Sequence, residues 1–443
     1  MVRIFGHSVR MQVLILAAIE AFTVYAAIFL LATLVVHSPD GPSGLTNAAT
    51  LPAILTIVMM LALGIYEPEA RANLATMTER LGVACIVGAG LGFGIVYVFD
   101  DIWVSPLYAI TCASFSYGAV TVARYIFGRF LNFVPLQRRI LVIGTTESGA
   151  SVRTVTKAGN EDGRVIGVIN AADARQGLLN RAKAMDISEI VVADRSAPLP
   201  VSALLDCKAS GIRILDSLDF GELETGKVDL ENLYPARFIF ARNTGYSSWS
   251  MRAKRFLDIV ISGATLVILS PVLLGAALAI RLDSPGGVFY RQTRTGLNGA
   301  PYEIIKFRSM RSDAEAAGTP QWAQENDTRI TRVGRFLRQT RIDELPQILN
   351  ILRGEMSIVG PRPERPFFVE QLEQSMPFYA ERHRVKPGLT GWAQIKYRYG
   401  ATEEDAREKL RYDLYYVKNF NVLLDIFIMM RTVRVVLWPD GVH

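Results

Sequence analysis

The chain is poor in the residues that build disulfide frameworks and zinc sites. It has three cysteines and four histidines in 443 residues. Cys85 and Cys112 fall inside apolar runs and Cys207 stands alone, so neither a disulfide scaffold nor a cysteine-based zinc site is expected. No two histidines stand at metal-ligand spacing, which argues against a histidine-based metal centre.

Recognisable nucleic-acid-binding patterns are also missing. The sequence has no helix-turn-helix, RRM or zinc-finger pattern, so its net charge of +6 is better explained by an anionic bilayer surface or a phosphorylated ligand than by nucleic acid. Half of the residues are hydrophobic and the mean hydropathy is positive, which soluble multidomain proteins seldom show. The length of 443 residues predicts two or three domains, at least one of them in lipid.

Four long apolar stretches open the chain. Each is near the ~20 residues that a helix needs to cross the hydrocarbon layer. They predict a four-helix transmembrane region over residues 1–135, and the first stretch is too long for the core of a cleaved signal peptide. The stretches are Met11 to Val36, Ala48 to Tyr66, Leu81 to Phe99 and Val104 to Phe127.

Lysine and arginine are absent from the loops on one side of these stretches, which carry acidic charges at Asp40, Asp100 and Asp101. Basic residues gather on the other side. By the positive-inside rule, the N-terminus and everything after the fourth stretch are therefore expected in the cytoplasm. The basic residues are Arg3, Arg10, Arg71, Arg80, Arg124, Arg129, Arg138 and Arg139.

One acidic residue, Glu20, lies in the middle of the first stretch. An ionisable residue at that depth marks a proton or ligand site, or it bonds to a neighbouring helix across the bundle. We favour the second interpretation because no other polar residues gather around Glu20 in the sequence.

Residues 136–216 change to short β-branched runs that alternate with helical ones. This pattern predicts a small Rossmann-like domain built on a parallel sheet. Its first turn, Gly144 to Gly149, stands where a dinucleotide-binding loop would, but Thr146 occupies the place of the glycine that lets the backbone approach a pyrophosphate. A regulatory or structural module is favoured over a nucleotide-binding one. Residues 217–250 are predicted as a linker.

A fifth apolar run, Phe256 to Ile280, is interrupted at Ser270 and Pro271. The run is long enough to cross a membrane, but basic residues flank both of its ends, so the charge rule favours both ends in the cytoplasm. Proline removes one helix hydrogen bond and collides with the preceding turn, so a break at Pro271 could fold the run into a hairpin that enters and leaves one leaflet. A kinked helix that crosses the membrane is the alternative.

The C-terminal segment carries the excess of positive charge. Residues 246–443 hold 28 Lys and Arg against 21 Asp and Glu, which suits a substrate with several phosphates because arginine offers forked donors to phosphate oxygens. Two adjacent acids, Asp343 and Glu344, follow a cluster of arginines whose spacing of three places neighbours on one helical face. The cluster consists of Arg329, Arg332, Arg335, Arg338 and Arg341.

The acid pair allows two interpretations. One acid attacks phosphorus while the other holds Mg²⁺, a cation that suits one or two carboxylates plus substrate phosphates. In the other interpretation Asp343 caps a helix, with Glu344 in its first turn and Pro346 close behind. The pair by itself does not decide between them.

Three further runs are too particular to be generic turns. Together with the segment Lys254 to Asp258 ahead of the Ser270–Pro271 break, their order resembles the bacterial sugar transferase family, the polyprenyl-phosphate sugar-1-phosphate transferases that begin exopolysaccharide and O-antigen assembly. The resemblance covers about the last 190 residues, and the four-helix start with the Rossmann-like domain is similar, more weakly, to the long form of the family. The runs are Lys306 to Met310, Gly354 to Pro363 and Val385 to Gln394.

The resemblance implies a two-step reaction in a mostly helical catalytic domain over residues 251–443. Asp343 is expected to attack the β-phosphorus of a UDP-sugar, expel UMP and hold the sugar phosphate covalently until undecaprenyl phosphate takes it. Glu344 is expected to bind Mg²⁺. The surface that binds the phosphates and the nucleotide is expected to include Arg338, Arg341, Pro361, Arg362, Lys306 and Arg308.

The resemblance also implies that the broken run forms a re-entrant membrane helix over about residues 256–282. The protein would then be a multi-pass protein of the bacterial inner membrane, with membrane lipid as a partner and its catalytic domain in the cytoplasm. Whether it forms a homo-oligomer is left open. The residues expected to shape or anchor the hairpin are Lys254, Arg255, Asp258, Ser270 and Pro271.

One departure from the family pattern concerns the sugar. After Trp392 to Gln394 many members continue with an Asn-Gly-Arg-like turn, whereas this chain reads Ile395 to Gly400. Two competing functions stay open: a membrane lipid-phosphate hydrolase that uses the same acids, and a catalytically dead membrane sensor or scaffold. The closing run, Asn421 to Trp438, suits an interfacial helix and a buried one equally well.

Overall fold

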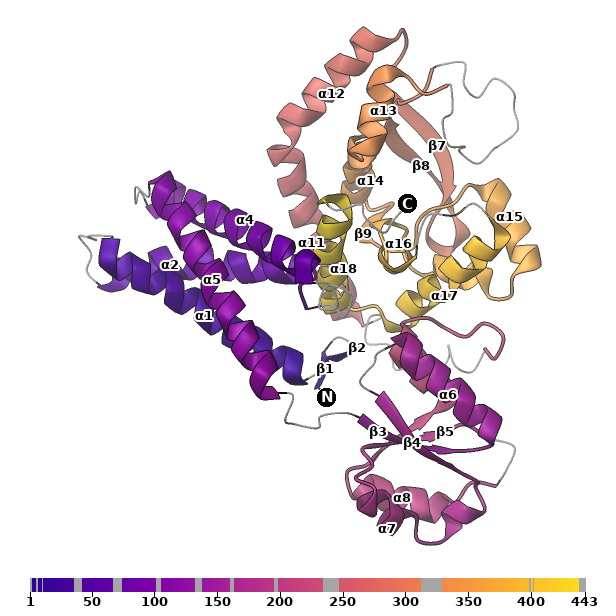
Figure 1. Ribbon diagram of the computed structural model, residues 1–443. Coiled ribbons are helices and arrows are strands. Elements are labelled where there is room, and N and C mark those ends of the chain that lie inside the picture. Colours follow the sequence, from indigo (N-terminus) through magenta and orange to yellow (C-terminus); the bar gives the residue numbers. More distant parts are fainter. Residues whose placement is uncertain are drawn as a thin grey trace. The chain divides into compact units, whose positions relative to one another are not determined.

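The computed structural model divides the chain into two compact units, Met1–Thr225 and Gly226–His443. The first unit holds a group of long apolar helices and a parallel sheet, and the second holds the two acids at Asp343 and Glu344 (Figure 1). The structure describes residues 2–4, 7–9, 11–35, 42–66, 74–100, 105–131, 138–159, 163–194, 198–233, 247–311, 329–397, 400 and 402–437.

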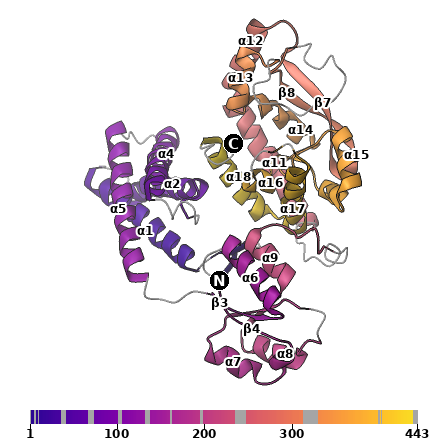
Figure 2. The same cartoon turned by 45° about the vertical axis from the view of Figure 1, so that its right-hand side comes forward.

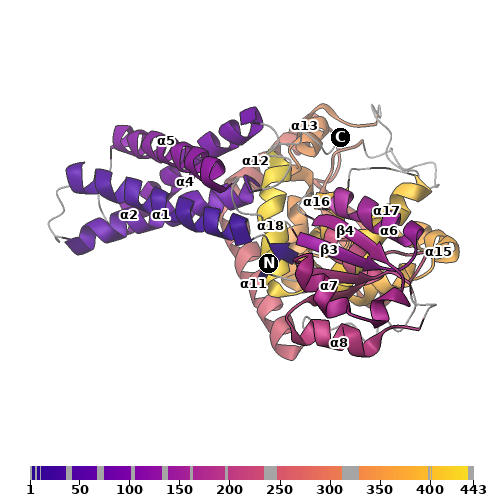
Figure 3. The ribbon, with the colours of Figure 1, turned by 60° about the horizontal axis from the view of Figure 1, so that its bottom comes forward.

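The N-terminal part of the first unit consists of long helices that pack side by side (Figure 3). Helices α2 and α5 each pack against both α1 and α4. Three of the described helices contain stretches long and apolar enough to cross a membrane, Ile15–Thr33, Ala75–Val98 and Pro106–Phe127, whereas the apolar part of α2, Ala49–Ala62, is shorter. A short antiparallel pair, β1 (Val2–Ile4) and β2 (His7–Val9), precedes them. The helices are α1 (Met11–Val35), α2 (Pro42–Ala62), α4 (Leu74–Asp100) and α5 (Pro106–Leu131).

Glu20 in α1 is completely buried and accepts hydrogen bonds from two other segments of this bundle. Its carboxylate receives the Tyr66 hydroxyl at 2.7 Å and the Arg124 guanidinium Nη2 at 2.9 Å. The interpretation that Glu20 bonds a neighbouring helix is therefore confirmed. Such pairing removes the cost of placing a lone charge between apolar helices.

Two glycines bring α4 close to α2. A Cβ atom at Gly88 would lie 2.4 Å from the Thr56 Cα, and one at Gly92 would lie 2.3 Å from the Pro52 Cα. Glycines four residues apart present one smooth face, which lets two helix backbones meet at short range. The sequence contains this spacing of glycines, but hydropathy gives no sign of it because glycine does not interrupt the apolar pattern.

The sheet of the first unit has four parallel strands in the order β4-β3-β5-β6. Helices α6 and α9 cover one face of it, and α7 and α8 cover the other (Figure 2). The predicted parallel α/β arrangement is confirmed. The strands are β3 (Arg138–Ile143), β4 (Gly163–Ile169), β5 (Glu189–Val192) and β6 (Arg213–Asp216), and the helices are α6 (Thr146–Gly159), α7 (Leu178–Ala184), α8 (Val201–Ala209) and α9 (Ser217–Thr225), with the 3₁₀ turn η1 (Asp173–Arg175).

The predicted linker, 217–250, is wrong over most of its described residues. Residues 217–225 form α9, whose Phe220 is 1% exposed in the core beneath the sheet. Val228 and Leu230 are buried in the core of the second unit. A few apolar side chains among polar ones give little local signal, and tertiary burial decides their structure. Residues 234–246 lie outside the described part of the chain.

The first two described helices of the second unit meet at a sharp bend of 62°. Its core gathers around α17 and includes the buried residues Leu424 and Ile428 of α18. The closing run is therefore a helix packed into the core, and the interfacial alternative is not supported along this face. The elements are α11 (Ser248–Ile268), α12 (Ser270–Asp283), β7 (Phe289–Thr295), η2 (Leu297–Gly299), β8 (Pro301–Phe307), α13 (Arg332–Gln339), η3 (Ile342–Gln347), α14 (Ile348–Arg353), β9 (Ser357–Val359), α15 (Pro366–Ser375), η4 (Tyr379–Arg384), β10 (Gly388–Thr390), α16 (Trp392–Lys396), α17 (Glu403–Asn419) and α18 (Val422–Leu437).

The bend between α11 and α12 lies at the predicted break. Pro271 has no N–H, so the Val267 carbonyl loses the hydrogen bond that a continuous helix would supply. The Ser270 hydroxyl donates to that carbonyl at 2.8 Å instead. The break is therefore confirmed, and the Val267 carbonyl keeps two donors at the bend, this hydroxyl and a backbone N–H of the α11 C-terminal cap.

Three side chains of α11 fix the hairpin to the rest of the second unit. The Asp258 carboxylate accepts hydrogen bonds from the Ser357 hydroxyl at 3.0 Å and the Ile358 N–H at 2.9 Å. The Lys254 ammonium donates to the Val359 carbonyl and to Asp425, and the Arg255 guanidinium donates to the last carbonyls of α14. All three residues were expected to shape or anchor the broken run, and they tie α11 to β9, α14 and α18.

The close approach of α4 and α2 can be tested with a pair of alanine substitutions. Gly92→Ala is expected to destabilise the purified protein in detergent by about 1–3 kcal/mol because the new methyl group meets backbone. Gly94→Ala is the matched control, since nothing lies within 4 Å of its added Cβ, and it should be neutral or stabilise by up to ~1 kcal/mol. Equal unfolding midpoints for the two variants would contradict the packing.

Candidate active site

The two acids stand in the 3₁₀ helix η3, and neither of them caps it. The residue ahead of η3 is Arg341, whose φ of 59° is left-handed, and no side-chain cap bond is present there. Asp343 and Glu344 lie inside the first turn and are 8% and 9% exposed. The capping interpretation is therefore wrong. Helix α13 ends at Gln339, so Arg341 also leaves the helical face that it was expected to share with Arg338.

Glu344 is held by two cations from distant parts of the chain. Its Oε1 accepts from the Lys306 ammonium at 2.9 Å and from the Arg362 guanidinium at 2.7 Å. Burial alone would raise the pKa of Glu344, but Arg362 and Lys306 reverse this effect and hold the pKa well below its usual range. Glu344 is therefore a buried carboxylate that stays ionised.

Asp343 is the opposite case. In the described part of the chain no group donates a hydrogen bond to its carboxyl group. Burial raises the pKa of Asp343, the neighbouring Glu344 charge raises it further, and the nearby cations Lys306, Arg338 and Arg341 oppose the rise. A carboxylate without hydrogen bonds is a better nucleophile than a solvated one, and cations beside it favour its ionised form.

Arg338 in α13 offers an unused donor near this acid. Its Nη1 is buried and has no hydrogen-bond partner among the described residues. Buried hydrogen-bond donors in folded proteins nearly always have an acceptor. A phosphate oxygen beside Asp343 would satisfy this donor, which agrees with the place in phosphate binding that the sequence suggested for Arg338.

The strand that carries Lys306 is locked to the acids by a buried asparagine. Asn350 of α14 accepts from the Ile305 N–H at 3.0 Å and donates to the Glu303 carbonyl at 2.7 Å, so one side chain satisfies a donor and an acceptor on a single edge of β8, while β7 pairs with the other edge. Its side chain is completely buried. Sequence analysis missed Asn350, which stands within an apolar run where nothing sets it apart.

Arg362 follows a point where two backbone segments lie in close contact. These segments belong to two of the runs that carry the family resemblance. Strands β9 and β10 pair in parallel, and the Gly388 N–H donates to the Pro361 carbonyl at 2.9 Å. A Cβ atom at Gly360 would lie 2.2 Å from the Lys386 carbonyl oxygen, so the close contact requires glycine. The runs from Gly354 to Pro363 and from Val385 to Gln394 thus pack against each other through β9 and β10. Their contact positions Arg362 beside Glu344.

Arg308 has another use in this structure. Its guanidinium donates to the carbonyls of Ser284 and Pro285 at 2.8 Å and to the Ser284 hydroxyl at 2.9 Å. These bonds fasten the turn after α12, the second arm of the hairpin. We therefore leave Arg308 out of the phosphate-binding set proposed below and assign it to the support of the hairpin.

The residues at the acid pair fit a magnesium ion held jointly with a substrate. Among the described residues no group of three or more His, Cys, Asp or Glu side chains could hold a metal. Glu344 uses Oε1 for its two cations, and no described group donates to its Oε2. Mg²⁺ commonly takes one or two carboxylate ligands and completes its coordination shell with substrate phosphates and water. Glu344 Oε2 would therefore be the ligand that the protein supplies.

The comparison with known proteins identifies the second unit. The Bacterial sugar transferase family matches residues 249–439. The chain is 40% identical over 265 residues to the UDP-glucose:undecaprenyl-phosphate glucose-1-phosphate transferase of Escherichia coli (strain K12), a match that covers 58% of this chain and 56% of that protein. It is 39% identical over 238 residues to the UDP-N-acetylgalactosamine-undecaprenyl-phosphate N-acetylgalactosaminephosphotransferase of Aeromonas hydrophila, over 54% and 55% of the two chains.

The matched segment thus spans about half the length of these two relatives. A shorter relative is covered almost entirely. The Exopolysaccharide production protein PSS of Rhizobium leguminosarum bv. phaseoli is 45% identical over 186 residues, which are 41% of this chain and 92% of that protein. The predicted family is confirmed by this match and by the family model, and the chain belongs to the bacterial sugar transferase family.

Proposed function

We propose that the protein transfers a sugar-1-phosphate from a UDP-sugar to undecaprenyl phosphate and releases UMP. The observation that carries the proposal is the contrast between the two acids: Glu344 is ionised and held by Lys306 and Arg362, whereas Asp343 beside it is buried with no hydrogen-bond donor. The related proteins are named for this class of transfer.

In the first step an oxygen of Asp343 forms a bond to the β-phosphorus of the UDP-sugar, and the bond from that phosphorus to the bridging oxygen breaks. UMP leaves with the bond's electron pair, and the sugar phosphate stays on Asp343 as an acyl phosphate. In the second step a phosphate oxygen of undecaprenyl phosphate attacks the same phosphorus, and the bond to Asp343 breaks. The lipid then carries a sugar diphosphate, and the carboxylate is restored.

The cations around the acids supply the charge that this reaction needs. Negative charge on the phosphoryl oxygens is stabilised by Arg338, Arg341 and Lys306, which are already in place before substrate binds. Magnesium bound to Glu344 and the diphosphate would neutralise further charge on the donor. Pro361 and Arg362 remain the residues that we assign to the uridine nucleotide.

The apolar helices support a membrane location for this reaction. We propose that the N-terminal helices form a four-helix transmembrane bundle, that the sheet domain is Rossmann-like, and that the catalytic unit lies in the cytoplasm. We also propose that α11 and α12 form a re-entrant hairpin. Large apolar side chains on both arms are exposed to the surroundings, and hydrocarbon would cover them. They include Phe256, Val267, Ile268, Leu274, Leu278 and Leu282, which are 62–79% exposed.

The transferase reaction can be tested with purified protein in detergent, Mg²⁺, undecaprenyl phosphate and a panel of UDP-sugars. Wild-type protein should release UMP and form a lipid-linked sugar diphosphate. Asp343→Asn should lower the rate by more than about 10³-fold because the amide cannot form the covalent bond. Asp173→Asn, at an exposed position in the sheet domain, is the control. Full turnover by Asp343→Asn would disprove the covalent role, and release of inorganic phosphate would indicate the hydrolase.

The metal requirement is a separate test. Removal of Mg²⁺ with EDTA should stop UMP release, and added Mg²⁺ should restore it. Glu344→Gln keeps the size of the side chain and removes its charge, so the Mg²⁺ concentration for half-maximal rate should rise by at least about tenfold. An unchanged Mg²⁺ dependence of the residual rate in this variant would rule out Glu344 as the ligand.

The hairpin topology can be measured by cysteine labelling. In a variant without Cys85, Cys112 and Cys207, a cysteine placed at the exposed Gly287 in the turn after α12 should react with an impermeant maleimide only from the cytoplasmic side. Ser105→Cys, before α5, should react only from the opposite side. Labelling of the Gly287 position from outside would mean that the broken run crosses the membrane.

A further inference from the structure

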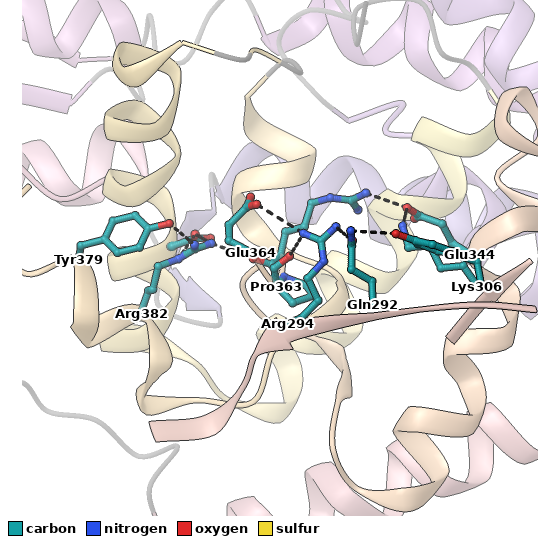
Figure 4. A network of polar contacts seen from close by, with 11 residues as sticks. Gln292, Arg294, Lys306, Glu344, Pro363, Glu364, Tyr379 and Arg382 are labelled. Atoms are coloured by element: carbon teal, nitrogen blue, oxygen red, sulfur yellow. Dashed lines mark hydrogen bonds and ion pairs between the residues drawn. The ribbon is translucent and has the colours of Figure 1, made fainter. Parts of the chain in front are cut away.

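A buried ion pair stands behind the site and has no part in the reaction described so far. We propose that Arg382 and Asp413 position Arg362, and through it Glu344, for the transfer reaction. The inference rests on the proposed function and deepens it, because it assigns a role to two residues that touch neither substrate nor the reacting acids. The contacts form one connected network that passes through the backbone carbonyl of Arg362 (Figure 4).

The guanidinium of Arg382 in η4 is oriented by two partners. It donates to the Asp413 carboxylate of α17 from Nε at 3.1 Å and from Nη2 at 2.7 Å, and to the Tyr379 hydroxyl from Nη1 at 2.7 Å. Arg382 is 5% exposed and Asp413 is 2% exposed. A planar group bonded along two of its edges cannot rotate, so its remaining donor points in one direction.

That remaining donor reaches the site. Nη2 of Arg382 also donates to the backbone carbonyl of Arg362 at 3.0 Å. The side chain of the same Arg362 donates to Glu344 at 2.7 Å. The buried pair thus holds the backbone of the residue whose side chain holds the acid.

The segment around Arg362 depends on such support. Residues 361–364 form neither helix nor strand, and the backbone hydrogen bonds that hold them are two isolated ones at 2.9 Å, from the Gly388 N–H to the Pro361 carbonyl and from the Thr295 N–H to the Glu364 carbonyl. Neither of them bonds Arg362 itself. Arg294 of β7 bonds the next residue from another side, through the Pro363 carbonyl at 3.1 Å, and it lies 3.7 Å from the Glu364 carboxylate. The two arginines hold the carbonyls between these backbone hydrogen bonds, those of Arg362 and Pro363, and they do so only while their donors are correctly directed.

A buried ion pair is weak evidence for stability, because apolar residues of similar volume often serve a core equally well. An apolar pair could not donate to the Arg362 carbonyl. This difference separates a positioning role from a packing role, and it can be measured.

The test is a double-mutant cycle on the transferase rate, with Arg382→Lys and Arg362→Lys made singly and together. Arg382→Lys should lower kcat by about 10- to 100-fold, as expected for a displaced catalytic group, while KM for the UDP-sugar changes by less than about threefold. In the Arg362→Lys background the same substitution should lower kcat by less than about threefold, since the link from Arg362 to Glu344 is already broken. Arg384→Lys is the matched control, an exposed arginine of η4 paired with Glu381, and should leave the rate unchanged.

An equal loss of kcat in both backgrounds would overturn the inference, since a merely structural residue acts independently of Arg362. If Arg382→Lys does not fold, the pair Arg382→Met with Asp413→Leu replaces it in the same cycle, because it leaves no unpaired buried charge. A folded Met/Leu variant with wild-type kcat would also overturn it. Wild-type UMP release is measured first: its absence would refute the proposed function, whereas an active wild type with an additive cycle would refute this inference alone.

Discussion

The second unit depends on one electrostatic constraint, which is that a buried carboxylate stays ionised only where cations reach it. Glu344 is 9% exposed, and its charge is stabilised by Lys306 and Arg362 at hydrogen-bond distance. Each cation must be brought there by its own piece of scaffold. The β7–β8 hairpin brings Lys306, and the pairing of β9 with β10 brings Arg362. Both of these strand pairs therefore serve to position the two side chains.

The same constraint separates the two acids chemically although they are neighbours in sequence. The cations bond Glu344 directly and act on Asp343 only through space, so one acid is fixed and the other is left without hydrogen bonds. Two carboxyl groups with different environments can take different roles, one as ligand and one as nucleophile. The contrast comes from which side chains reach η3, because both acids are almost equally buried.

The bend of 62° between α11 and α12 has a different physical basis. Pro271 has no N–H to offer the Val267 carbonyl, which accepts instead from the Ser270 hydroxyl and from a backbone N–H at the C-terminal cap of α11. At its other end α11 is tied to β9 by Asp258 and to α14 by Arg255. Helix α11 is therefore fastened to the strand that precedes Arg362, so the position of the broken apolar helix pair is coupled to the position of the acid site.

The sequence by itself determined the apolar helices, the parallel α/β sheet, the break at Pro271, the anchor residues and the family, because hydropathy, strand periodicity, proline and short motifs are local properties of the chain. Tertiary structure alone decided that Asp343 does not cap a helix, that Arg308 supports the hairpin, and that residues 217–225 belong to the sheet domain. It alone revealed Asn350, Arg382 and Asp413. These residues look like ordinary polar positions in sequence, since the cost of burying a charge or an amide appears only when distant segments close around it.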